Sequence, residues 1–120
     1  MGANLINSFR VALIMRLYHN PRCSKSRQAL ALLKDSGVKF EEYRYLKEGI
    51  DNEDMSTLFA VQGIIRISDL NAEDDFDLSK FDEFKLLMES RPEVLQRPVL
   101  IHNEKAVIGR PPEDILILLP

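Results

Sequence analysis

The chain has 120 residues, a formal net charge of −3 and 45% hydrophobic residues, a profile typical of one ordinary globular domain. A general nucleic-acid binder would carry a basic face, so the acidic balance disfavours that class. One cysteine and two histidines exclude an internal disulfide and leave no spacing typical of zinc ligands, so no metal is expected. The sequence holds no run of about 18 apolar residues, and no membrane span is expected.

The first 14 residues lack the charged start and the cleavage site of a secretory signal. We expect residues 1–14 to be an N-terminal extension or a remnant of cloning, with Met15 as a plausible natural start. Residues 15–120 are expected to form a single domain and a monomer. Because one cysteine argues against an oxidising compartment, we expect a cytoplasmic protein.

The predicted elements alternate strands and helices at both ends of this domain. A strand is expected at about 13–19, an amphipathic helix at 24–36 with Gly37 as its stop, and a strand at 38–45. The middle is helical, with segments at 53–62, 64–70 and 79–89. Two short strands at 99–101 and 106–108 form a hairpin, and a final helix begins at Pro111-Pro112 and continues through 115–119.

This order predicts an α/β protein with a thioredoxin-like fold. A βαβ unit and a ββα unit would share one mixed four-stranded sheet, with the helical segments inserted between the two halves. In that fold the thiol follows the first strand and begins the first helix. The proline before the hairpin is commonly cis, so we predict a cis Arg97–Pro98 bond as a structural feature.

Cys23 lies where the first helix is predicted to begin. A helix N-terminus carries partial positive charge and unpaired N–H groups. With Arg22, Lys25 and Arg27 nearby, this favours the thiolate over the thiol, whose ordinary pKa is about 8.5. A lone cysteine is more often a small buried apolar residue, so a core cysteine is the alternative at this point.

Three further arginines lie at predicted element ends: Arg66, Arg97 and Arg110. Guanidinium groups that converge on one thiolate would bind a tetrahedral oxyanion through paired N–H donors. The alternative is that each is an ordinary surface arginine.

The chain resembles a known family at these positions. The pattern His19-Asn20-Pro21-x-Cys23-x-x-Ser26-Arg27, followed by Arg66, Arg97-Pro98 and Gly109-Arg110-Pro111, is similar to the glutaredoxin-coupled arsenate reductase family. The resemblance covers about residues 15–120 and is nearest to the short, arsenate reductase-like members.

The resemblance implies a reaction and assigns roles to these residues. Arsenate would dock against the three arginines, and the Cys23 thiolate would attack arsenic to give a thiol–arsenate adduct. Glutathione, a co-substrate and not a bound cofactor, would displace the adduct at arsenic or sulfur, and glutaredoxin would resolve the mixed disulfide. Ser26 would donate a hydrogen bond to the thiolate. His19 and Asn20 would shape the loop and stabilise charge, and Arg27 would contribute an electrostatic field. For His19, an ordinary residue at the end of a strand is the alternative.

Three other functions are alternatives to this one. A stress-response regulator that binds RNA polymerase shares the fold, but its typical Cys-x-x-Cys switch would need a second cysteine where Ser26 stands. A phosphatase-like arsenate reductase would need Cys-x5-Arg, and Ala29 occupies the arginine position. A general glutathione-dependent thiol reductase is not excluded by any residue.

Overall fold

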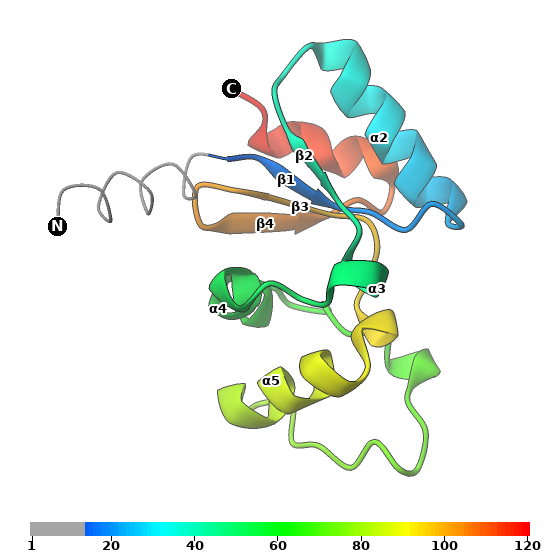
Figure 1. The fold of residues 1–120 in the computed structure, drawn as a ribbon, viewed down its shortest axis with the longest axis vertical. Helices are drawn as coiled ribbons and strands as arrows, with labels where there is room; N and C mark the ends of the chain where they lie inside the picture. The colour runs from blue at the N-terminus through cyan, green and yellow to red at the C-terminus, as the bar shows by residue number, and fades with distance from the viewer. Residues whose placement is uncertain (1–13) are drawn as a thin grey trace, which may run out of the picture.

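The computed structural model describes residues 14–120, so the predicted extension lies, except for its last residue, outside the described residues. Four strands form one mixed sheet in the order β2-β1-β3-β4 (Figure 1). The strands are β1 (Arg16–Tyr18), β2 (Glu41–Tyr43), β3 (Val99–His102) and β4 (Lys105–Ile108). β1 pairs in parallel with β2 and antiparallel with β3, and β3 pairs antiparallel with β4. The predicted mixed four-stranded sheet is confirmed.

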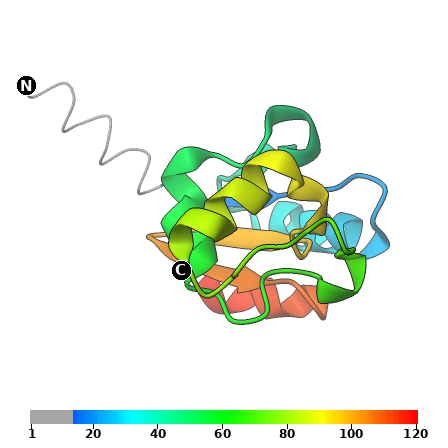
Figure 2. The same cartoon turned by 90° about the horizontal axis from the view of Figure 1, so that it is seen from below.

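Helices cover both faces of this sheet. On one face lie α2 (Ser24–Ser36), which connects β1 to β2, and the C-terminal 3-10 helix η4 (Pro112–Leu118). The inserted helices α4 (Met55–Phe59) and α5 (Phe81–Ser90) cover the opposite face, as Figure 2 shows from below. α2 ends where predicted because Gly37 takes the left-handed conformation, with φ of 76°.

The segment at 38–45 differs from its prediction as one strand. Only β2 is a strand, and Tyr45 begins the short helix α3 (Tyr45–Glu48). Aromatic and β-branched residues favoured a strand, but their alternation is imperfect. Tertiary packing outweighs this preference, because the Tyr45 ring is fully buried against the Tyr18 ring, with 5.8 Å between the ring centroids.

The inserted segment contains more 3-10 helix than the sequence indicated. The expected helix at 53–62 divides into η1 (Asn52–Asp54) and α4, and the turn at 64–70 contains η2 (Ile67–Asp69). α5 matches its prediction and η3 (Pro92–Val94) follows it. Phe81, expected in the core, lies at the edge with 37% exposure and its ring packs on the Phe59 ring.

The C-terminal half delivers two arginines to the same end of the sheet. The Arg97–Pro98 bond before β3 is cis, as the sequence predicts, and the Arg110–Pro111 bond after β4 is also cis. The hairpin turn places Asn103 and Glu104 at positive φ. The final helix is 3-10 and begins at Pro112 because Pro111 is extended.

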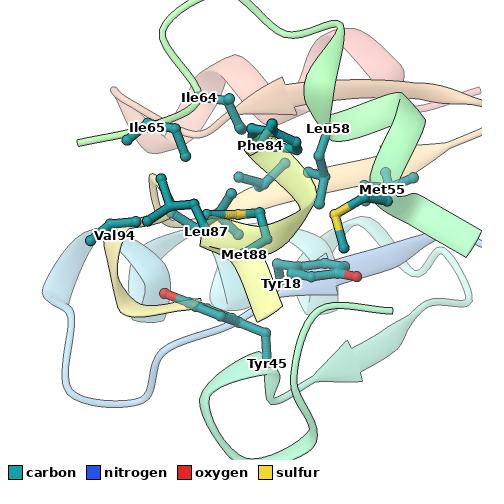
Figure 3. Close-up of a cluster of buried hydrophobic side chains, with 13 residues drawn as sticks. Tyr18, Tyr45, Met55, Leu58, Ile64, Ile65, Phe84, Leu87, Met88 and Val94 are labelled. Atoms are coloured by element: carbon teal, nitrogen blue, oxygen red, sulfur yellow. The ribbon is translucent and has the colours of Figure 1, made fainter. Parts of the chain in front are cut away.

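Two apolar clusters fill the space on either side of the sheet. The smaller joins the sheet to α2 and η4 through Leu17, Leu33, Leu100 and Ile115, all fully buried. The larger lies between the sheet and the inserted helices, and Figure 3 shows ten of its members with labels. Among residues 14–120, no helix combines the length and the apolar character needed to cross a membrane.

Candidate active site

Cys23 lies at the junction of the loop after β1 and helix α2. Its backbone is extended, with φ of −96° and ψ of 123°, and it is the N-cap residue of α2. The Cys23 N–H donates to the carbonyl of Asn20 at 3.0 Å, and the Cys23 carbonyl accepts the first helical hydrogen bond from Arg27 at 3.0 Å. Cys23 is half-buried, so the core-cysteine alternative does not hold.

The surroundings of the sulfur favour the thiolate. Partial burial acts to raise the pKa of Cys23, but the backbone N–H groups of Ser26 and Lys25 and the guanidinium groups of Arg97 and Arg110 outweigh it. The pKa of this thiol is therefore lower than that of a free cysteine. Arg110 Nη2 lies 3.6 Å from the Cys23 sulfur. These two N–H groups carry the partial positive charge of the helix N-terminus. The Cys23 side chain does not make a regular capping hydrogen bond with α2.

Ser26 takes a different position from the one expected of it. Its hydroxyl is fully buried, accepts from the backbone N–H of Asn20 at 2.9 Å and lies 2.8 Å from His19 Nδ1. We expected the Ser26 hydroxyl to donate a hydrogen bond to the sulfur. Instead, the backbone N–H of Ser26 acts on the thiolate. A serine at this position therefore shapes the loop that carries Cys23.

His19 and Asn20 form the remainder of that loop. Burial lowers the pKa of His19, so the ring is neutral at neutral pH. The Asn20 side-chain oxygen accepts from the Arg22 N–H at 3.0 Å and stabilises the turn. Arg27 Nη1 donates to the carbonyl of Pro21 at 2.9 Å, which gives this residue a tethering contact in place of the purely electrostatic role expected of it.

Two of the three predicted arginines, Arg97 and Arg110, act on the Cys23 sulfur, and Asp69 links Arg66 to Arg97. Arg110 donates from Nε to the carbonyl of Arg97 at 2.9 Å, which fixes its guanidinium next to the sulfur. The side chains of Arg66 and Arg97 are only 27% and 22% exposed, so they do not extend into bulk water. The surface-arginine alternative fails for this pair.

Asp69 joins this cluster and was not expected from the sequence. Its Oδ2 lies 3.0 Å from Arg66 Nε and 3.6 Å from Arg97 Nη1. The first pair is close, but its N–H is not aligned for a hydrogen bond, because Arg66 Nε lacks a partner of suitable geometry. A carboxylate thus occupies a position between two of the arginines.

Unpartnered donors are concentrated around this site. Within residues 14–120, three buried side-chain polar atoms lack a hydrogen-bond partner: Arg66 Nε, Arg97 Nε and the Tyr45 hydroxyl. A cavity of about 370 Å³ is lined by Tyr45 and Arg97 together with Asn20 and Asp69, among others. Of the three residues, Tyr45 and Arg97 line this cavity. Buried polar groups are nearly always paired, so donors left open beside a cavity indicate a site for an acceptor-rich ligand. In the same part of the chain, no group of three or more His, Cys, Asp and Glu residues could hold a metal ion.

Comparisons with known proteins identify the family. The family model of the ArsC family matches residues 18–118. The chain is 38% identical to the Escherichia coli protein YfgD, covering 85% of this chain and 93% of that protein. It is 36% identical to a Neisseria meningitidis protein named arsenate reductase, covering 88% and 97% of the two chains. The solved structure of an arsenate reductase from Vibrio cholerae matches with a TM-score of 0.62 and 28% identity, covering 90% of this chain and 99% of that one. With its thioredoxin-like fold, the chain belongs to the ArsC family.

Proposed function

We propose that this protein reduces arsenate to arsenite through Cys23. The observation that carries the proposal is the half-buried thiol with its lowered pKa, 3.6 Å from Arg110 Nη2 and acted on by Arg97, which Asp69 links to Arg66. Such a site pairs a nucleophilic sulfur with donors for a tetrahedral oxyanion. The relatives named arsenate reductase support arsenate as that oxyanion.

The reaction would begin with attack of the Cys23 thiolate on As(V). An S–As bond forms and an As–O bond breaks, and the leaving arsenate hydroxyl takes up the proton of a second arsenate hydroxyl and departs as water. The guanidinium groups would offset the charge on the remaining oxygens. Removing one such donor from a protected anion site costs about 2.7–4 kcal/mol of transition-state stabilisation in well-studied enzymes.

The electrons would come from two thiols. A thiolate of glutathione attacks the Cys23 sulfur, the S–As bond breaks, and its electron pair stays on arsenic, which leaves as arsenite. The product on the protein is a Cys23–glutathione disulfide. Glutaredoxin would reduce this disulfide and restore the thiol. The single cysteine supports this scheme, because the chain has no second thiol to resolve the disulfide internally. The same single cysteine supports a cytoplasmic location.

A coupled assay tests the proposal. The protein, glutathione and glutaredoxin are expected to convert arsenate to arsenite, and Cys23→Ser is expected to abolish turnover. Ser24→Ala is the matched control, since Ser24 is an exposed neighbour on the same helix. Activity on glutathionylated substrates without arsenate turnover would favour a general thiol reductase instead. Binding to RNA polymerase without any reductase activity would favour the regulator.

A further inference from the structure

Tyr45 is a buried residue whose hydroxyl has no partner in the structure. Its side chain is fully buried, and its ring packs at 5.8 Å from the ring of Tyr18. The two hydroxyl groups point in opposite directions (Figure 3). The Tyr18 hydroxyl donates to Asp54 at 2.7 Å and accepts from the Asp51 N–H at 3.1 Å, whereas the Tyr45 hydroxyl makes no hydrogen bond.

An unpartnered hydroxyl in this position destabilises the free protein. A buried donor without a protein partner carries a desolvation penalty that an acceptor on a bound ligand would relieve. Phenylalanine would fill the same space without that penalty. The hydroxyl at Tyr45 therefore requires an explanation outside the packing of the core.

The surroundings of this hydroxyl are those of the candidate active site. Tyr45 lines the cavity of about 370 Å³ that Asn20, Asp69 and Arg97 also border. Its phenol interacts electrostatically with Arg97, Cys23, Arg66 and Arg110. Burial raises the pKa of Tyr45 to about 12, so the phenol is protonated at neutral pH and offers an O–H donor.

We propose that the Tyr45 hydroxyl donates a hydrogen bond to an oxygen of the tetrahedral oxyanion bound at the arginine cluster. This inference rests on the proposed function, and it adds a neutral donor to three cationic ones. A neutral donor orients the anion through a short, directional contact. It adds no positive charge, so it contributes to anion binding without lowering the pKa of the neighbouring thiol.

Protection of Cys23 from alkylation measures this contact. Iodoacetamide labels the wild-type protein, and arsenate or inorganic phosphate is added as the protecting anion without any external thiol. Tyr45→Phe is expected to raise the half-protecting concentration about tenfold, equivalent to about 1.4 kcal/mol. The thermal unfolding midpoint of Tyr45→Phe should equal or exceed that of the wild type. The midpoint of the pH profile of Cys23 alkylation should be the same in this variant as in the wild type.

Tyr18→Phe is the matched control, because it removes a buried hydroxyl that is fully partnered. This variant should unfold at a lower temperature and keep wild-type protection. Three outcomes would overturn the inference: unchanged protection in Tyr45→Phe, weaker protection with a lower unfolding midpoint, or a raised alkylation midpoint that assigns the hydroxyl to the sulfur. A wild-type protein that neither anion protects would overturn it as well. If the protein lacks arsenate turnover but phosphate protection depends on Tyr45, only the proposed substrate is wrong.

Discussion

Replacement of Arg110 by alanine should raise the pKa of Cys23. Arg110 Nη2 lies 3.6 Å from the sulfur and the residue is exposed. At that distance, Coulomb's law gives about 1.2 kcal/mol with the dielectric constant of water and about 4.6 kcal/mol at an effective value near 20. Because the guanidinium is exposed, the lower figure applies, and about 1.4 kcal/mol corresponds to one pKa unit. We therefore expect an increase of about one unit.

The pH profile of iodoacetamide alkylation provides the assay. The midpoint of the wild-type profile should lie below the value of about 8.5 for a free cysteine. In Arg110→Ala it should move up by about one unit, and Arg110→Lys should restore part of the shift. The midpoint is a better measure than a rate at one pH, since a thiolate of higher pKa is intrinsically more nucleophilic and partly masks the loss.

Arg44→Ala is the control for the loss of one positive charge. The Arg44 guanidinium pairs with Glu42 at 2.7 Å, away from the sulfur contacts described above. Its removal should leave the alkylation midpoint of Cys23 in place. An Arg110→Ala midpoint that coincides with the wild-type value would refute the view that this guanidinium holds the sulfur as an anion.

Four further changes have defined expectations. Asp69→Asn removes the carboxylate between two arginines and should tighten phosphate binding, measured by calorimetry, by up to about fivefold, or roughly 1 kcal/mol; weaker binding would contradict the geometry. Ser26→Ala leaves buried groups of the loop unpaired and should lower the free energy of unfolding in urea by about 1–3 kcal/mol. Burial lowers the pKa of His19, so below about pH 6.5 the unfolded chain binds more protons than the folded protein. The free energy of unfolding should therefore fall as the pH decreases below this value, and His19→Gln should reduce this pH dependence. Leu100→Ala, in the fully buried centre of the sheet, should cost about 2–5 kcal/mol of unfolding free energy.

The order of elements could be predicted because apolar spacing and turn residues specify it locally. Gly37 ends α2 through its left-handed backbone, and the hairpin follows from two apolar runs around a polar turn. The short helix at Tyr45 could not be predicted, because packing against Tyr18 determines it.

The candidate site was only partly visible in the sequence. Cys23 and the three arginines stand at the ends of elements, where an active site in an α/β fold gathers its residues. Asp69 and Tyr45 belong to no local pattern, and only the folded chain brings them to the cavity. The direction of the Ser26 hydroxyl, toward the sulfur or toward His19 and Asn20, depends on a side-chain rotation that a sequence does not encode.

Mass spectrometry of Cys23 after mixing the protein with arsenate and glutathione tests the central claim most directly. If arsenate is reduced through this sulfur, a Cys23–glutathione disulfide should accumulate in the absence of glutaredoxin, and only when arsenate and glutathione are both present. An unmodified Cys23 in a reaction that produces arsenite, or the same disulfide without arsenate, would contradict the account.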